Sequence, residues 1–168
     1  MSAPAPTPHR ATVAALQDAL ATEHAAVWAY GLISAFVPPE LTDQVDEAAT
    51  AHRARRDATE RILSDTGVEP VPTEPAYRTP SPVTDLAGAL MLAITAEDDT
   101  AAAWRSVIER SVIEHSGVIE NGGVLERHAQ PGLRTTALDA LVGAAVRASR
   151  WRSAAGAPVR TVPFPGAP

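Results

Sequence analysis

Fifteen residues near the middle of the chain, VEPVPTEPAYRTPSP (residues 68–82), decide how the rest of it is arranged. Five of them are prolines, which lack the N–H that a helix interior needs. In a polyproline-like conformation, at about 3.1 Å per residue, the segment spans roughly 46 Å, whereas a 26-residue helix is about 39 Å long. A loop that only reversed direction would need about two to eight residues. We therefore expect this linker to cross the full length of a helical bundle.

Apolar residues recur at three- and four-residue spacing on both sides of the linker, as they do along one face of a helix. Pro38-Pro39 ends the first such run, Gly67 follows the second, and Thr84-Asp85 offers a cap for the third. A short turn makes the first two helices antiparallel, and the long linker makes the second and third parallel. The pattern predicts four long helices, over about 11–37, 39–66, 84 into the 110s, and 133–155.

These directions define an all-α four-helix bundle with one long crossover between helices two and three, the arrangement called ferritin-like. A chain of 168 residues is long enough for one such domain and too short for two comfortable ones. The expected organisation is a flexible N-terminus at 1–10, a bundle at 11–155 with its crossover at 68–82 and a connector at 116–132, and an extended C-terminal tail at 156–168.

Composition removes several classes of function. The net charge is -6 and all 14 basic residues are arginine, so we expect no nucleic-acid partner. No run of eighteen apolar residues exists, so we expect no membrane span, and the first ten residues lack the features of a signal peptide, which favours a cytoplasmic protein. With no cysteine, disulfides, iron–sulfur clusters and thiolate zinc sites are excluded, and any metal would need His and carboxylate ligands.

Three ionisable residues, Glu23, His52 and Glu97, each interrupt an otherwise apolar stripe. Glu23 stands about 14 residues before the first turn and His52 about 14 after it, while His52 and Glu97 each lie about 12 residues into their helices. The predicted directions therefore bring the three side chains to one height in the bundle. An unpaired buried carboxylate costs several kcal/mol, so this site must supply a metal ion, another cation or a proton.

One interpretation is a metal centre in which Glu23, His52 and Glu97 hold a single iron or manganese ion. A di-iron centre needs Glu-x-x-His on two helices, but Ala49 stands three residues before His52, and the fourth predicted helix contains no histidine.

A second interpretation places arginine where the metal would be. Arg56 beside His52, or Arg147 on the fourth helix, can satisfy a carboxylate with two parallel hydrogen bonds, and Arg53, Arg55 and Arg150 lie close by in sequence. In a third interpretation, these arginines bind a small organic anion.

Five segments carry a resemblance to a known family: EHAAVWAYG (23–31), AHRARRD (51–57), YRTPSPV (77–83), AAAWR (101–105) and TTALDALVGAAVRASRWR (135–152). In order and spacing the chain resembles an actinobacterial family of ferritin-like domains of unknown function, over nearly its whole length. The resemblance implies a ferritin-like four-helix bundle rich in alanine and arginine, with no established reaction. It also implies that Glu23, His52 and Glu97 match positions where ferritin-like metalloproteins place ligands.

Taken together, the sequence predicts a binding or interaction module without a cofactor, in which a buried Glu/His/Arg cluster stands in place of a di-iron centre. The alternative is a metal-dependent oxidase-like or oxygenase-like enzyme with a partial site, so enzymatic activity is left open. The tail, PVRTVPFPGAP (158–168), carries Val159, Val162 and Phe164, which are apolar and need a groove. The tail can fold back onto its own bundle or reach across to a neighbouring copy, and we expect a homodimer in which exchanged tails are buried.

Overall fold

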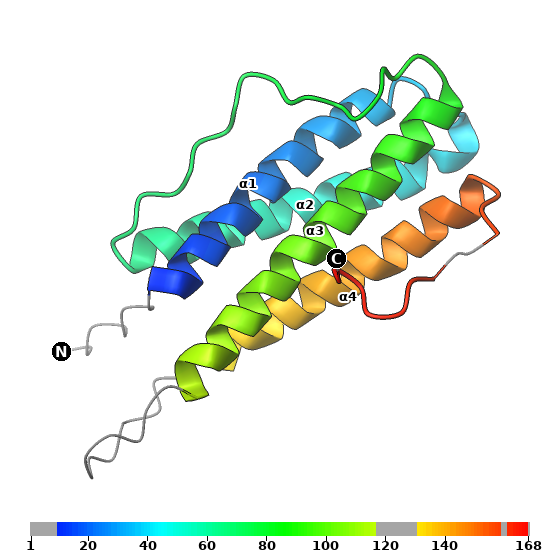
Figure 1. Cartoon of the computed structure of the whole chain (residues 1–168). Helices are drawn as coiled ribbons and strands as arrows, with labels where there is room; N and C mark the ends of the chain where they lie inside the picture. Colours follow the sequence, from blue (N-terminus) through cyan, green and yellow to red (C-terminus); the bar gives the residue numbers. More distant parts are fainter. Residues whose placement is uncertain (1–9, 117–130, 159–160, 168) are drawn as a thin grey trace, which may run out of the picture.

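The computed structural model describes residues 10–116, 131–158 and 161–167, and within them it is all-helical, as predicted. Its helices pack as a bundle (Figure 1). Residues 1–9 of the predicted N-terminal segment and residues 117–130 of the predicted connector lie outside the described residues. None of the described helices is long and apolar enough to cross a membrane. The helices are α1 (Arg10–Ile33), α2 (Pro39–Asp65), α3 (Leu86–Ser116) and α4 (Pro131–Ala154).

The first helix ends four residues earlier than the spacing predicted. After Ile33 the backbone tightens, with Ala35 N donating to Leu32 O at 3.2 Å and Phe36 N donating to Ile33 O at 3.0 Å. The residue before a proline is pushed out of the helical region, so the chain must leave the helix ahead of Pro38. The apolar residues of this turn pack on the core without being helical.

The third helix begins at the predicted cap. Asp85 Oδ1 accepts a hydrogen bond from Gly88 N at 2.8 Å, which satisfies one of the free N–H groups of the first turn. The fourth helix begins at Pro131, two residues earlier than predicted, because a proline is favoured in the first helical position.

The proline-rich linker lies along α1. The amide of Gln17 donates to Glu69 O at 2.6 Å and accepts from Val71 N at 2.7 Å, and further along both segments Trp28 and Tyr77 have ring centroids 5.9 Å apart. Contacts therefore advance in the same order on α1 and on the linker. Figure 1 shows the same course, with the linker running from the end of α2 to the distant start of α3.

Two apolar clusters fix the directions of the helices. At one end, the core joins Ile33 near the end of α1, Val45 near the start of α2 and Leu90 near the start of α3. At the other end, Leu16, Leu63 and Trp104 meet from the start of α1, the end of α2 and the middle of α3. Because α2 and α3 each proceed from the first cluster to the second, they run in the same direction, and α1 runs against both.

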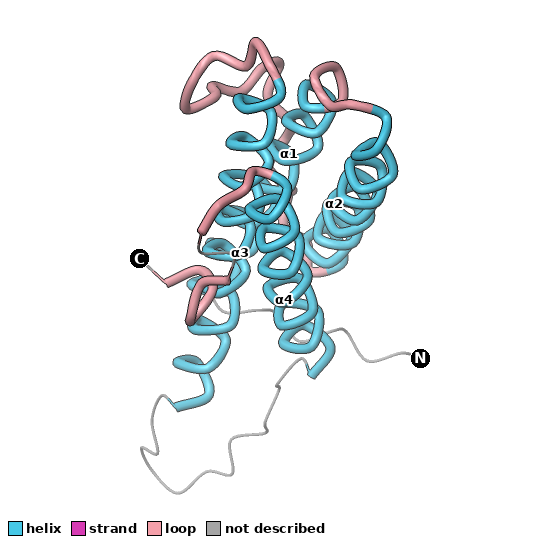
Figure 2. Tube along the Cα trace, turned by 90° about the vertical axis from the view of Figure 1, so that its right-hand side faces the viewer, coloured by secondary structure: helices cyan, strands magenta, loops and turns pink. Residues whose placement is uncertain are grey.

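The C-terminal tail folds back on its own bundle. Figure 2 shows it passing over α3 beside α4. Gly166 adopts a φ of 73°, and a Cβ at this position would lie 2.5 Å from Ala101 O, so only glycine fits this close approach to α3.

Replacing Gly166 with alanine is expected to release residues 161–167 from α3. The turn that closes the tail, in which Ala167 N donates to Phe164 O at 3.1 Å, should lose its protection against hydrogen exchange. The amides of the four helices should keep their protection, because the tail covers their surface rather than their core. Hydrogen exchange read by mass spectrometry checks this, and an unchanged tail would contradict the contact.

Candidate functional site

Glu23 on α1, His52 on α2 and Glu97 on α3 meet at the centre of the bundle, and none of the three has any exposed surface. His52 lies between the two carboxylates: its Nδ1 is 2.7 Å from Glu23 Oε2 and its Nε2 is 3.1 Å from Glu97 Oε1. The helix directions described above bring these residues to one height. Both ring nitrogens of the imidazole are therefore engaged by carboxylate oxygens.

Two arginines complete the ion pairs. Arg55 Nε donates to Glu23 Oε1 at 2.8 Å, and Arg147 Nε, on α4, donates to Glu97 Oε1 at 2.8 Å. Arg55 Nη2 also approaches His52 Nδ1 at 3.1 Å, but the shorter contact of Nδ1 with a carboxylate identifies that nitrogen as a donor. Each carboxylate thus has its own guanidinium, and the two share one imidazole.

Arg56 is not part of this cluster, which corrects the sequence prediction. Its Nε donates to the neighbouring Asp57 Oδ1 at 2.8 Å, and its side chain is 29% exposed. Arg55, one residue earlier, has the position that the sequence analysis gave to Arg56. Arg150 is also outside the cluster, since it contacts Glu47 at 3.2 Å on the surface.

Three aromatic side chains extend the cluster, and none of them was predicted from the sequence to belong to it. Trp104 Nε1 donates to Glu23 Oε1 at 2.7 Å, and Tyr30 OH donates to Glu97 Oε1 at 2.6 Å. Trp151 Nε1 donates to Tyr30 OH at 2.7 Å. A signal for two of them existed, because Tyr30 follows Glu23, and Trp104 follows Glu97, by one heptad on the same helix face.

The cluster favours charged forms of its acids and of its base. Burial by itself raises the pKa of Glu23 and of Glu97, but the hydrogen bonds from His52 and the charges of Arg55 and Arg147 outweigh it, so both pKa values lie below their usual range. Burial lowers the pKa of His52, but its hydrogen bonds to the two carboxylates outweigh that and raise the pKa above its usual value.

Tyr30 is held neutral. Burial, and then the charge of Glu97, raise the pKa of its phenol well above the usual value, so the hydroxyl stays protonated and donates to the carboxylate. The centre of the bundle is therefore an imidazolium between two carboxylates, surrounded by donors from all four helices.

These shifts predict a stability profile that falls on both sides of an optimum. The lowered carboxyl pKa values contribute stability above their ordinary value of 4.5, and this is lost as the pH falls through the folded values. The raised pKa of His52 contributes stability below its ordinary value of 6.5, and this is lost as the pH rises through the folded value. Urea denaturation at a series of pH values should therefore give the highest free energy of unfolding between these limits. A profile that is flat from acid to alkaline pH would contradict the charged cluster.

The residues at this site do not fit a di-iron centre. Ala49 supplies no ligand, α4 carries no histidine, and both nitrogens of His52 are already bound to carboxylates. Among the described residues, no group of three or more His, Asp or Glu side chains is arranged to hold a metal ion. Two buried atoms of the cluster, Glu97 Oε2 and Arg147 Nη2, have no hydrogen-bond partner in the described structure. They belong to a pair already joined through Nε and Oε1, so a small rotation or one bridging water would satisfy both.

In the part of the chain that the structure describes, fold and site define a four-helix bundle whose two apolar core clusters enclose an ionic one. The chain belongs to the family described as domain of unknown function (DUF4439), whose model matches residues 15–116. That range contains Glu23, His52 and Glu97 but not α4, which carries Arg147.

A solved structure has the same fold. The crystal structure of a conserved hypothetical protein from Mycobacterium tuberculosis is similar to this chain, with a TM-score of 0.73 and 36% sequence identity, over 88% of this chain and 98% of that one. No curated protein matches the chain.

Proposed function

We propose that this protein is a ferritin-like bundle in which an imidazolium and two guanidinium groups occupy the place of a metal centre, and that it acts as a binding or interaction module. The observation that carries the proposal is that both ring nitrogens of His52 are bound to carboxylates, Glu23 on one side and Glu97 on the other. A metal-binding imidazole needs one ring nitrogen free of a proton to donate its lone pair.

The charges of the cluster also support this proposal. Glu23 and Glu97 contribute two negative charges, Arg55 and Arg147 two positive ones, and the imidazolium one more. A divalent cation at the same place would add positive charge to a buried group that is already positive, which is costly in a low dielectric. Fixed ion pairs between four helices make a rigid scaffold, which suits a protein that presents a surface.

The small organic anion, the third interpretation of the sequence, has less support. Arg55 and Arg147 are each paired with a carboxylate, so within the described residues Arg147 Nη2 is the one buried donor of the cluster that remains for an anion. The alternative function is a metal-dependent oxidase-like or oxygenase-like enzyme with a partial site. The observation on its side is that Glu97 Oε2 is a buried acceptor without a donor.

Elemental analysis of protein produced with added iron and manganese separates the two functions. We expect no stoichiometric metal in the unmodified protein and no change in Glu23→Ala or His52→Ala. His24→Ala is a matched control, because His24 is also a buried histidine but lies outside the cluster, with Nε2 3.2 Å from Val71 O. One metal ion per chain that is lost in both cluster variants and kept in the control would overturn the module and support the enzyme.

A further inference from the structure

The outer face of α4 carries a stripe of exposed apolar side chains. Leu138, Val142 and Val146 follow one another at four-residue intervals and are 52%, 53% and 45% exposed. They lie opposite the residues of α4 that pack on the core, among which are Ala137, Ala140, Ala144 and Ala148. We call these three residues the α4 stripe. Contiguous exposed apolar surface is a feature of interaction sites.

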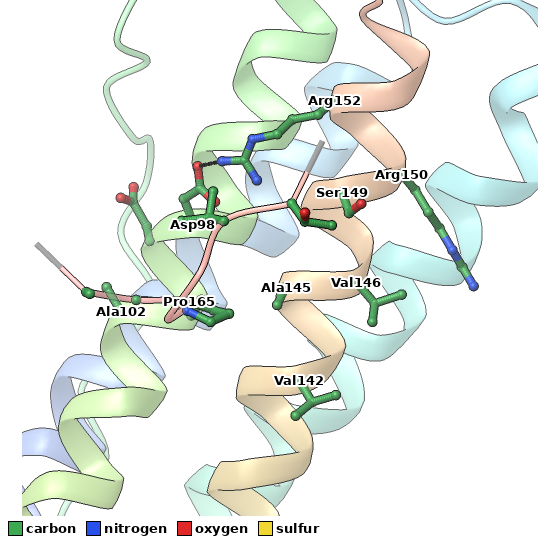
Figure 3. Close-up of a pocket in the computed structure, with 15 residues that line it drawn as sticks. Asp98, Ala102, Val142, Ala145, Val146, Ser149, Arg150, Arg152 and Pro165 are labelled. Carbon is green, nitrogen blue, oxygen red and sulfur yellow. Dashed lines mark hydrogen bonds and ion pairs between the residues drawn. The ribbon is translucent and has the colours of Figure 1, made fainter. Parts of the chain in front are cut away.

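A groove of about 720 Å³ opens beside the α4 stripe, between α3, α4 and the tail. Figure 3 shows Val142, Ala145 and Val146 along one side of it and Ala102 and Pro165 on the other. Its walls are mainly apolar, with Ser149 near one end and the ion pair between Arg152 and Asp98 beyond it. Stripe and groove therefore form one continuous surface on the same side of the molecule.

We propose that this surface binds a second copy of the chain, with the two α4 helices antiparallel and a two-fold axis at the level of residue 144. A two-fold axis is the usual symmetry of a soluble dimer, and each copy then contributes the same surface. Positions equally distant from residue 144 along α4 face each other. Val142 of one copy thus packs on Val146 of the other, and the reverse.

Charge complementarity supports this register. Asp139 and Arg150 are eleven residues apart, close to three helical turns, so they lie on the same flank of the α4 stripe. Asp139 precedes the axis by five residues and Arg150 follows it by six, so the axis places Asp139 of each copy beside Arg150 of the other. Asp139 is exposed and has no ion-pair partner among the described residues. Arg150 is half exposed, and its 3.2 Å contact with Glu47 leaves donors free.

Shape complementarity supports the same register on the other flank. Leu138 and Ser149 are also eleven residues apart, so helical spacing puts them on one flank of α4, and Ser149 lines the groove there. The axis brings Leu138 of each copy level with Ser149 of the other, where the groove of that copy is open. Leu138 of each copy therefore enters the groove of the other copy. The dimer covers the α4 stripe and the groove together.

Other occupants fit this surface less well. A small apolar ligand in the groove would contact Val142 and Val146 but would leave Leu138, which does not line the groove, exposed. A membrane surface attracts a helix whose polar flanks are basic, whereas this flank holds both Asp139 and Arg150 and the whole chain has a net charge of -6. A standard interface takes about 800 Å² from each partner, and α4, with 24 residues and a length of roughly 36 Å, provides a face of that scale together with the tail.

Sedimentation equilibrium of the full chain tests the dimer. We expect a dimer in the unmodified protein and a dissociation constant about a hundredfold weaker in Val142→Asp, because the substitution buries a charge at the centre of the interface. Met91→Asp is the matched control, since Met91 is a 60% exposed apolar residue on α3, outside this surface, and should leave the dissociation constant unchanged. Far-UV circular dichroism confirms that both variants remain helical. A monomeric unmodified protein overturns the proposal. If that monomer binds an apolar dye, the surface is assigned to a small ligand instead, and if it binds anionic vesicles, the surface is assigned to a lipid membrane.

Three further measurements test the register and the tail. The chain has no cysteine, so Val142→Cys and Val146→Cys introduce single thiols. Under oxidation, a mixture of the two variants should form covalent dimers faster than either variant alone, and equal rates would reject the antiparallel register.

Asp139→Arg and Arg150→Asp should each weaken the dimer about tenfold, and the double variant should restore it. A chain that ends at Ala157 should dimerise more weakly, because it lacks one wall of the groove. An unchanged dissociation constant would show that the tail does not contribute to the interface.

Discussion

Replacement of His52 with leucine should lower the free energy of unfolding by about 3–5 kcal/mol. The imidazolium is the only group that bonds both Glu23 and Glu97 in the described structure, and without it two buried carboxylates face each other across an apolar gap. Each keeps one arginine, which limits the loss but does not replace a donor at 2.7 Å from Glu23 Oε2. Urea denaturation near pH 6, followed by circular dichroism, measures the effect.

The matched control for this substitution is His24→Leu. His24 is also buried, but its Nε2 contacts Val71 O at 3.2 Å and an exposed carboxylate, that of Glu60, at 3.7 Å. Its loss should cost about 1 kcal/mol or less. Combining His52→Leu with Glu23→Gln should recover part of the lost stability, because one of the uncompensated charges is removed. Equal effects of the two histidine substitutions would contradict the central role of His52.

A second large effect is expected at Arg147. Arg147→Met keeps most of the side-chain volume but removes the guanidinium 2.8 Å from Glu97 Oε1, and we expect it to destabilise the protein by about 3–5 kcal/mol. The guanidinium lies over Gly143, where a Cβ would come within 3.2 Å of Arg147 Nη1, so the helix itself leaves room for this conformation. Thermal and urea unfolding of the variant check the prediction.

Arg56→Met distinguishes the loss of this ion pair from the loss of any arginine. Arg56 pairs with Asp57 at a partly exposed position, so its replacement should change the free energy of unfolding by about 0.5 kcal/mol or less. Adding Glu97→Gln to Arg147→Met should reduce the deficit, because the orphaned negative charge is gone. A change below about 1 kcal/mol for Arg147→Met would contradict the ion pair.

Sequence periodicity was sufficient to predict the four helices and the common height of Glu23, His52 and Glu97. The reason is physical: with 1.5 Å of rise per residue, counting from a tight turn gives axial position with an error of about one turn. The proline-rich linker supplied the remaining information, since its length and stiffness allow a crossover of the whole bundle. These features depend on distance along the chain, which a sequence contains.

Rotation around the helix axis was harder to predict, and it decided which arginine reaches the cluster. Arg55 and Arg56 follow His52 by three and four residues, so they lie on opposite sides of it. Only the side on which α1 packs determines that Arg55 meets Glu23, and a single sequence does not show that side. The hydrogen bonds of the two indoles were not predicted for a related reason. Trp104 and Trp151 fill the core whether or not their N–H groups have a polar acceptor, so the sequence does not show that they donate to the cluster.

The hydrogen-bonded cluster ends in an indole at each side: Trp104 donates to Glu23, and Trp151 donates to Tyr30, whereas the ring of Trp28 lies tilted against that of Tyr77 in the linker. The tryptophan fluorescence of the protein therefore reports on each end of the ionic cluster, through Trp104 and Trp151, and on the linker, through Trp28. Protonation of Glu23 would change the electric field at Trp104 directly, and disturbance of Tyr30 would be sensed by Trp151. Emission recorded from variants that keep one tryptophan each would follow the two halves of the core separately, in solution, without any attached label.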